Sequence, residues 1–486
     1  MKKHLLFVVI GSLFLAYVLY RAFSLSITYD EAWTIGSFVP LNLKDILFCN
    51  PCDANNQLLN TLLIKLFMLN GTRSLFIARL PNVLAFVIYT LFAAKISIRN
   101  FKRLTGICLF VLLLANPFLL DFFSIARGYG LALAFMMASV YYLTGFIRTL
   151  NIRSCNYSLL FGCLAVLSNF TLLNYLLAVI FLILFITNAK TGFHANFRKV
   201  LLWNIVFSLG IGLLCITPLY KLLQNHSLYY GGNNGVFQDS FVSLTAFSMY
   251  HPYNSVMAIL VTITMILLFA IAVFISFKGA KRKFMILMNE KKLILILLLI
   301  IPISANLFEH YLFGTLYLID RTALFYIPLF VIAFAALVND PEPSKAKVML
   351  IPIFILLTIF ASVNLFCNAN FHKTISWEFD SHTKDILSLI DKEGQRQNKT
   401  EMIDFAWPFE SGAHYYIDNN EFGHVSISKI SDDRESLNTK VDFYLFYDRP
   451  LNIVGYSAKD QLINSYKKDT MLAFARDGIY LFKNIH

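Results

Sequence analysis

Two adjacent carboxylates follow directly after the first long apolar run of the chain. Asp30 and Glu31 lie near the start of a polar stretch, residues 24–75, that separates this run from the next. Carboxylates at the mouth of an apolar cavity can act as a general base, as a metal ligand, or as both. Asp30 is the stronger catalytic candidate, and the candidate metal ligand, because adjacent side chains point in different directions. The structural alternative is a helix N-cap with an acidic first turn.

The same polar stretch carries several amides and a pair of cysteines. Asn55, Asn56 and Asn60 lie in the sequence DANNQLLNT. On a helix, Asn56 and Asn60 would share one face and could bind a sugar or each other, although such a face can also simply contact water. Cys49 and Cys52 form CNPC. This spacing allows a disulfide if the stretch lies outside the cytoplasm, with two thiols as the alternative.

An arginine stands where the fourth apolar run begins. Arg127 and Tyr129 lie in NPFLLDFFSIARGYG, about a turn and a half after Asp121. A guanidinium group matches phosphate oxygens bidentately, so we expect Arg127, with Tyr129 beside it, to bind the phosphate of a lipid-linked substrate. The alternative is that Arg127 pairs with Asp121 or extends to the lipid headgroups.

A second arginine occurs later, in NLFEHYLFGTLYLIDRTALFYIP. Arg321 is a further candidate phosphate ligand, and the alternative for it is an ion pair with Asp320 or Glu309. Glu309 and His310 are candidate substrate-binding residues. As a metal site they are weak, because two adjacent residues make a poor chelating pair.

The composition excludes a soluble globular protein. Of the 486 residues, 57% are hydrophobic and only 14% are charged, and apolar runs of about twenty residues recur. The sequence therefore predicts a mainly α, polytopic helical membrane protein with about eleven transmembrane helices. The predicted runs are 4–23, 76–97, 105–122, 129–148, 157–169, 171–188, 200–220, 254–277, 293–308, 322–338 and 348–366. The run at 157–188 has an alternative, two short helices meeting at Asn169 or a re-entrant feature.

The net charge of +12 is explained by basic residues in alternate loops, so no nucleic acid partner is expected. The positive-inside rule places the N-terminus in the cytoplasm and stretch 24–75 outside a cytoplasmic (inner) membrane. Segments 41–48 and 56–69 have the spacing of amphipathic helices that lie on the membrane surface. The basic positions are Lys2, Lys3, Arg99, Lys102, Arg103, Arg148, Arg153, Lys190, Arg198, Lys199, Lys278, Lys281, Arg282, Lys283, Lys291, Lys292, Lys345 and Lys347.

The composition changes after the last apolar run. Residues 1–367 are predicted to form the transmembrane domain, and 368–486 a small extracytoplasmic α/β domain. Segment 378–397 has the pattern of a soluble helix, and HVSISKI, VDFYLFYD and MLAFARDGIYLF alternate like strands.

The order of several short motifs adds a family resemblance. DEA after the first run, NNQLLNT, ARLPNVLAF and SIARGYGLALAF resemble the GT-C glycosyltransferases, in the group of the protein O-mannosyltransferases and lipid A aminoarabinose transferases. The resemblance covers about the first 190 residues and, loosely, RTALFYIPLF. It implies that Asp30 matches the first-loop acid of the family and that Arg127 and Arg321 bind the carrier phosphate. Many relatives have His where this chain has Gln57, which leaves a divalent metal an open question.

These observations together predict an inverting glycosyltransferase. It would take a sugar from a polyprenyl-phosphate donor and pass it to a glycolipid, glycan or protein acceptor on the extracytoplasmic side, surrounded by membrane lipids. Asp30 would serve as base or metal-linked residue, and the arginines would stabilise the leaving phosphate. The alternatives are a transporter or flippase for a polyprenyl-linked glycan and a non-catalytic assembly partner.

Overall fold

Two compact units make up the protein. A computed structural model describes residues 2–69, 71, 74–191, 195–277, 291–339, 349–405, 407–428, 441–447 and 470–484. The helical unit comprises Met1–Ala22 and Leu41–Ala369, and the C-terminal unit comprises Phe23–Pro40 and Asn370–His486. Part of the first polar stretch thus belongs with the end of the chain. Some basic positions of the predicted inner loops lie outside the described residues: Lys278, Lys281, Arg282, Lys283, Lys345 and Lys347.

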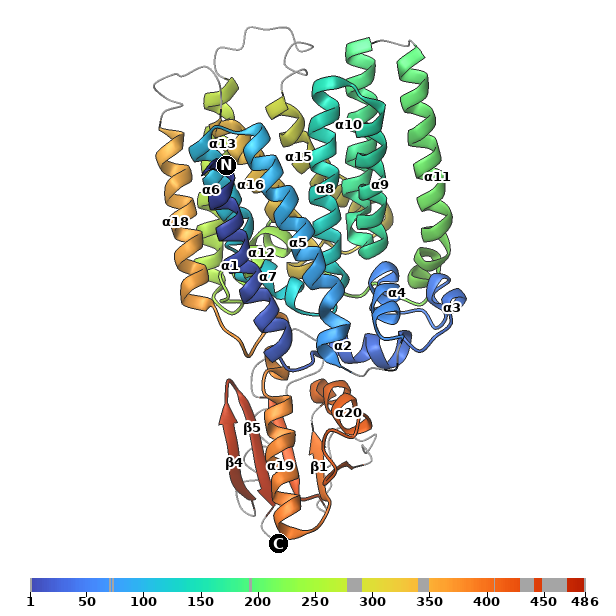
Figure 1. Ribbon diagram of the computed structural model, residues 1–486, viewed down its shortest axis with the longest axis vertical. Helices are drawn as coiled ribbons and strands as arrows, with labels where there is room; N and C mark the ends of the chain where they lie inside the picture. The colour runs from blue at the N-terminus through green and yellow to red at the C-terminus, as the bar shows by residue number, and fades with distance from the viewer. Residues whose placement is uncertain are drawn as a thin grey trace. The chain divides into compact units, whose positions relative to one another are not determined.

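Long apolar helices form the helical unit (Figure 1). Among the described residues, eight helices are long and apolar enough to span a membrane. The protein is therefore an integral membrane protein of mainly α structure, as predicted. These helices are α1 (Lys2–Ser24), α5 (Leu75–Asn100), α8 (Gly128–Thr149), α10 (Leu173–Thr191), α11 (Ala195–Gln224), α13 (Ser255–Phe277), α15 (Lys291–Phe313) and α18 (Leu350–Asn368).

The remaining predicted runs are shorter or broken helices. The run at 105–122 is not one straight span but two helices bent by 59°. The break occurs because Pro117 begins a new helix whose N-cap, Asn116, accepts a hydrogen bond from the amide of Leu119 at 3.1 Å. Asn169 separates α9 from η2 and α10, and only α9 is a short helix, because α10 is among the eight long ones. The elements are α6 (Arg103–Leu114), α7 (Pro117–Ser124), α9 (Ile152–Ser168), η2 (Phe170–Leu172) and α16 (Tyr326–Val338).

Three long helices, α5, α8 and α10, each carry a basic residue in the last turn. Arg148 donates to the carbonyl of Arg99 at 3.3 Å, and Lys190 donates to the carbonyl of Ile147 at 2.7 Å. These bonds bring the last turns of α5, α8 and α10 together, and they form a basic end of the helical unit.

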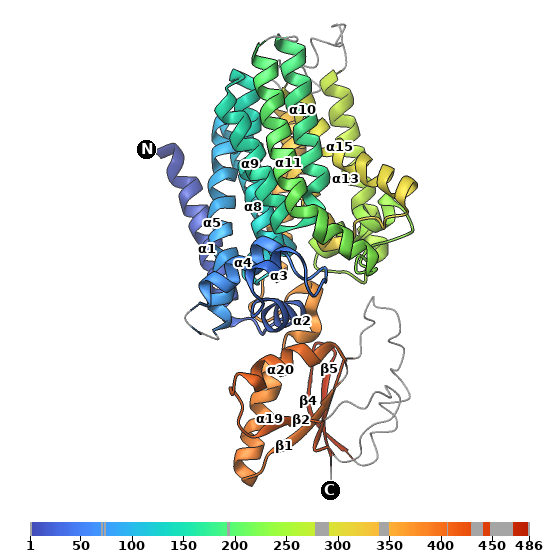
Figure 2. The same cartoon turned by 90° about the vertical axis from the view of Figure 1, so that its right-hand side faces the viewer.

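Short helices lie at the opposite end of the helical unit (Figure 2). The amphipathic helices predicted within 41–48 and 56–69 are present as α3 (Leu43–Leu47) and α4 (Leu58–Phe67). Three further short elements connect the long helices: η3 (Val236–Val242), α12 (Ser243–Ser248) and η4 (Asp320–Ala323).

A five-stranded mixed sheet forms the core of the C-terminal unit, as the α/β prediction required. Its strand order is β2-β1-β3-β5-β4, with parallel pairs around β1 and antiparallel pairs around β5. A two-residue turn joins β4 to β5, and both of its residues, Asp477 and Gly478, have positive φ. The strands are β1 (Glu401–Phe405), β2 (Val425–Ile427), β3 (Phe443–Tyr447), β4 (Thr470–Arg476) and β5 (Ile479–Asn484).

Helical segments complete the C-terminal unit. The soluble helix predicted over 378–397 is η5 (Ile375–Asp380) followed by α19 (Thr383–Gln397), and η6 (Trp407–Phe409) leads into α20 (Glu410–Asp418). From the first polar stretch come α2 (Tyr29–Trp33), with Asp30 and Glu31, and η1 (Thr34–Phe38).

Candidate functional site

Arg127 is held by the connection between α3 and α4. It is the buried N-cap residue of α8, and its Nη2 donates to Asn55 Oδ1 at 2.8 Å. One residue later, the amide of Gly128 donates to Gln57 Oε1 at 2.6 Å. Residues of the first polar stretch therefore cap the first turn of α8 and fix the direction of the guanidinium group.

Two buried asparagines extend this network across three helices. Asn60 on α4 donates to the carbonyl of Ala126 at 3.1 Å and accepts from Asn82 Nδ2 at 3.0 Å. Asn82 on α5 in turn accepts from the amide of Leu131 on α8 at 3.2 Å. The segment that carries Arg127 is thus bonded on both sides, which restricts its movement.

The prediction that Asn56 and Asn60 share one helix face is wrong. Helix α4 begins only at Leu58, because Gln57 is its extended N-cap residue. Asn56 therefore precedes the helix, and its Nδ2 donates to the carbonyl of Ile46 at 3.1 Å. Asn55, Asn56 and Asn60 each bind a different part of the helical unit, and their contact with a sugar stays a prediction.

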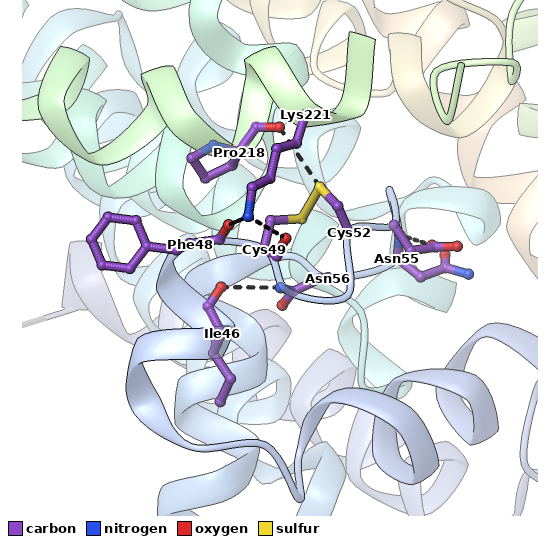
Figure 3. The surroundings of a disulfide bond; sticks show 9 residues. Ile46, Phe48, Cys49, Cys52, Asn55, Asn56, Pro218 and Lys221 are labelled. Carbon is purple, nitrogen blue, oxygen red and sulfur yellow. Dashed lines mark hydrogen bonds between the residues drawn. A yellow bond between two sulfur atoms is a disulfide. The ribbon is translucent and has the colours of Figure 1, made fainter. Parts of the chain in front are cut away.

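A disulfide closes the turn that precedes these amides (Figure 3). Cys49 and Cys52 are bonded to each other, with their Cα atoms 4.4 Å apart. Lys221 near the end of α11 donates to the carbonyl of Phe48 at 2.8 Å and to that of Cys49 at 3.3 Å. The bridge and the lysine together fix the start of the connection that reaches Asn55.

Arg321 is positioned by an aromatic ring that sequence reasoning did not single out. Its guanidinium carbon lies 4.1 Å from the centre of the Tyr230 ring, close enough for a cation–π contact. The Tyr230 hydroxyl donates to Asp320 Oδ2 at 2.6 Å. Burial raises the pKa of Asp320, and the charge of Arg321 and the Tyr230 hydroxyl partly offset this rise.

Tyr129 and Arg321 both lie close to Tyr230. Burial raises the pKa of Tyr230, the charge of Arg321 opposes this rise, and Tyr129 adds a small part to it. Tyr129 lies in the first turn of α8, two residues after Arg127. The structure thus brings predicted phosphate ligands from α8 and η4 to one region of the helical unit.

Glu309 and His310 are adjacent in sequence but have separate partners. Glu309 Oε2 accepts from Asn174 Nδ2 at 2.9 Å. The His310 ring stacks on Tyr317 with 4.0 Å between ring centres, and its Nδ1 lies 2.6 Å from the carbonyl oxygen of Thr315. Because a carbonyl can only accept, Nδ1 carries the proton. Each of the two side chains is thus already bonded within the helical unit, and its contact with substrate stays a prediction.

Asp121 is bound to residues that lie far from it in sequence. It forms a buried ion pair with Arg21 on α1, at 2.5 Å. The Tyr250 hydroxyl lies 2.8 and 2.9 Å from the two carboxylate oxygens of Asp121. The charge of Asp121 is therefore balanced by a residue 100 positions away, which no local pattern indicates.

Asp30 and Glu31 lie in the first turn of α2, within the C-terminal unit. Glu31 completes a capping box: the Thr28 amide donates to Glu31 Oε2 at 3.0 Å, and the Glu31 amide donates to Thr28 Oγ1 at 3.4 Å. The structural alternative, an N-cap followed by an acidic first turn, is therefore present, with Thr28 as the N-cap. Asp30 is also buried, with 6% of its surface exposed, and its catalytic role stays a prediction.

A third carboxylate, which the sequence did not indicate, lies beside this pair. Asp380 Oδ2 accepts from the amide of Tyr29 at 2.6 Å. Burial raises the pKa of Asp380 well above its usual range; the Tyr29 amide opposes this, and the charges of Asp30 and Glu31 add to it. Even so, no group of three or more His, Cys, Asp or Glu residues in the described part of the chain is arranged to hold a metal ion.

Known proteins resemble this chain in structure and not in sequence. No protein-family model matches the sequence, and no curated protein sequence matches it. The structure is similar to that of ArnT from Cupriavidus metallidurans in the apo state, with a TM-score of 0.52 and 9% identity over 99% of this chain and 97% of that one. It is also similar to the same protein bound to undecaprenyl phosphate, with a TM-score of 0.53 and 9% identity over 99% and 98% of the two chains.

A match that covers both chains almost completely, at so low an identity, shows a shared fold. The predicted architecture, many apolar helices followed by a small C-terminal sheet domain, is therefore confirmed, and it is the fold of ArnT.

Proposed function

We propose that this protein is a membrane glycosyltransferase that transfers a sugar from a polyprenyl-phosphate donor to an acceptor on the extracytoplasmic side. The observation that carries the proposal is the fold match over nearly the whole chain to ArnT, one structure of which contains undecaprenyl phosphate. Fold alone does not define function, so the site residues must support it. The clustering of Arg321, Tyr129 and Tyr230 supports a phosphate site in the helical unit.

The two arginines would bind the donor phosphate. Arg127 is oriented by Asn55, and Arg321 is stacked on Tyr230. Groups that are fixed before the reaction stabilise developing charge without reorganisation in the transition state. As the glycosidic C–O bond breaks, its electron pair stays on the phosphate, and the guanidinium groups would stabilise that charge. Tyr129 would add a hydroxyl donor.

Asp30 would act as the general base of an inverting reaction. It would take the proton of the acceptor hydroxyl, whose oxygen attacks the anomeric carbon opposite the phosphate. Glu31 would hold the helix turn through its capping box with Thr28. If a divalent metal takes part, Asp30 is the candidate ligand. Asn55, Asn56, Asn60, Glu309 and His310 are the candidate contacts for sugar or acceptor groups.

The same proposal gives the protein a place in the cytoplasmic membrane. The basic end of the helical unit would face the cytoplasm, and the C-terminal unit would lie outside it with the acceptor. The acceptor would be a glycolipid, glycan or protein.

Turnover of a radiolabelled polyprenyl-phosphate sugar tests the proposal. We expect wild-type protein in lipid nanodiscs to transfer the label, and Asp30→Asn to lower kcat by roughly 100-fold or more, as loss of a general base does. Asp418→Asn is the matched control, because Asp418 is an acid of the same unit with its side chain 74% exposed. Absence of turnover by the wild type across several donor sugars would refute the proposal. Loss of turnover in the presence of a chelator would show that a divalent metal takes part in the reaction.

A further inference from the structure

The segment that leads into Asp30 is bonded to residues near the end of the chain. Within the C-terminal unit, residues 25–28 are buried. Three hydrogen bonds join residues 24–27 to residues in or beside η5 and α20. Ser24 Oγ donates to the Phe371 carbonyl at 2.7 Å, Ser26 Oγ donates to the Ser381 carbonyl at 3.3 Å, and the Ile27 amide donates to the Tyr416 hydroxyl at 2.9 Å.

Asp380 adds a fourth bond, at the helix that carries Asp30. Its Oδ2 accepts from the amide of Tyr29, the first residue of α2. The first amides of a helix have no partner within the helix, and α2 continues directly into η1 to give a helical segment of only ten residues, 29–38, which is too short to be stable by itself. The geometry of Asp30 thus depends on caps from outside α2, and Asp380 supplies one of them from more than 350 positions away.

This cap is a buried acidic side chain that lies beside two other acidic side chains. Asp380 is 1% exposed and lies beside Asp30 and Glu31, so an ionised Asp380 would face two like charges. Burial and these neighbours favour the neutral acid, and the Tyr29 amide opposes them. The cap itself rests on geometry, because Asp380 Oδ2 can accept from the Tyr29 amide in either protonation state.

We propose that Asp380 is a positioning residue of the transfer reaction, through which the C-terminal unit sets the orientation of Asp30. This inference rests on the function proposed above. Because the proposed phosphate ligands Arg127 and Arg321 belong to the helical unit, loss of the Asp380 cap should lower kcat and leave the KM for the donor unchanged. A small misplacement of a catalytic group can cost about 100-fold in rate.

Two substitutions separate positioning from general stability. Asp380→Ala removes the acceptor of the Tyr29 amide, and we expect kcat to fall by at least about 10-fold with the donor KM within about twofold. Asp380→Asn keeps a carbonyl oxygen at the same place and should restore most of kcat. Asp418→Ala is the control, since this exposed acid lies in the same unit and should leave kcat unchanged. Equal loss in the Ala and Asn variants, or no loss in either, would overturn the role.

Hydrogen–deuterium exchange of the peptide covering residues 24–33 gives a readout that needs no turnover. Exchange should be faster in Asp380→Ala and close to wild type in Asp380→Asn. Unchanged exchange in both variants would refute the role of Asp380 as a cap, whether or not the protein is active. If the wild type is inactive but exchange changes as expected, only the proposed transferase activity is refuted. If Asp380→Ala does not fold, Tyr416→Phe tests the same segment, because it removes the hydroxyl group that accepts from the Ile27 amide.

Discussion

Gly128 is the position at which the proposed phosphate site should be most sensitive to one added methyl group. A Cβ atom built on Gly128 would lie 2.1 Å from the carbonyl oxygen of Ser168 and 3.0 Å from Gln57 Oε1. Real Cβ atoms essentially never approach closer than 3.0 Å. In Gly128→Ala, α8 and the end of α9 must therefore separate by about 1 Å, because the neighbour is a backbone atom that cannot rotate away.

The expected cost has two parts. Overpacking of this kind costs about 1–3 kcal/mol of stability. The same movement pulls the Gly128 amide from Gln57 and shifts the neighbouring Arg127, so we expect a 10- to 100-fold lower kcat/KM for the donor, on the order that a 1 Å misplacement produces. Gly212→Ala is the matched control, since its Cβ would meet nothing within 4 Å. It should be neutral or stabilise α11 by up to about 1 kcal/mol.

Thermal melting and donor kinetics of the two variants, measured side by side in nanodiscs, test this reasoning. We expect a lower midpoint and a weaker donor interaction for Gly128→Ala only. If Gly128→Ala melts and turns over like Gly212→Ala, then α8 is not packed against α9 as described, and the placement of Arg127 derived from it is refuted.

Three further predictions concern other parts of the protein. Tyr230→Phe keeps the ring under Arg321 but loses one hydrogen bond, so the donor KM should rise about fivefold, corresponding to about 1 kcal/mol. Tyr230→Ala also removes the ring and should raise the donor KM further. Equal KM values for the two variants in donor titrations would contradict the cation–π contact. Replacing both Cys49 and Cys52 by Ser should lower the free energy of unfolding by about 2 kcal/mol, as expected for so short a loop, and reduced wild type should melt at the same temperature as this variant. Asp380→Asn should change the pH dependence of melting: the folded-state pKa of Asp380 is raised, so its contribution to stability is complete below about pH 4 and is lost as the pH rises through the folded value. The variant should therefore gain stability relative to wild type between pH 4 and pH 8, and parallel melting profiles would count against the raised pKa.

The architecture was predictable because lipid imposes a strong and local pattern. Apolar runs of about twenty residues predicted nearly all the long helices, and alternating apolar residues predicted the strand segments of the C-terminal unit apart from β1. The break between α6 and α7 was missed, although Pro117 preceded by Asn116 is a helix-start signal. An apolar run by itself does not show that its helix is continuous.

The candidate site was only partly predictable, because its contacts join residues far apart in sequence. The motifs indicated Arg127, Arg321 and Asp30, and local spacing indicated the Cys49–Cys52 pair. Nothing in the sequence placed Asp380 beside Asp30, which lies 350 positions earlier. Such pairings depend on tertiary packing, which neither helical period nor residue type encodes.

The ion pair of Asp121 is a second contact between residues far apart in sequence. Asp121 is six residues from Arg127, and this spacing suggested a local ion pair, but it did not indicate the contacts of Asp121 with Arg21 and Tyr250. Arg127 is bound by Asn55, from a loop that the apolar pattern leaves undefined.

The most direct test of the account is the balance of products from one labelled donor. Purified wild-type protein in sealed vesicles would receive a polyprenyl-phosphate sugar labelled in the sugar, together with an acceptor extract. We predict one polyprenyl phosphate released for each labelled sugar attached to acceptor, and loss of both products in Asp30→Asn. Intact donor that crosses the bilayer without release of polyprenyl phosphate would contradict the transferase and establish a transporter.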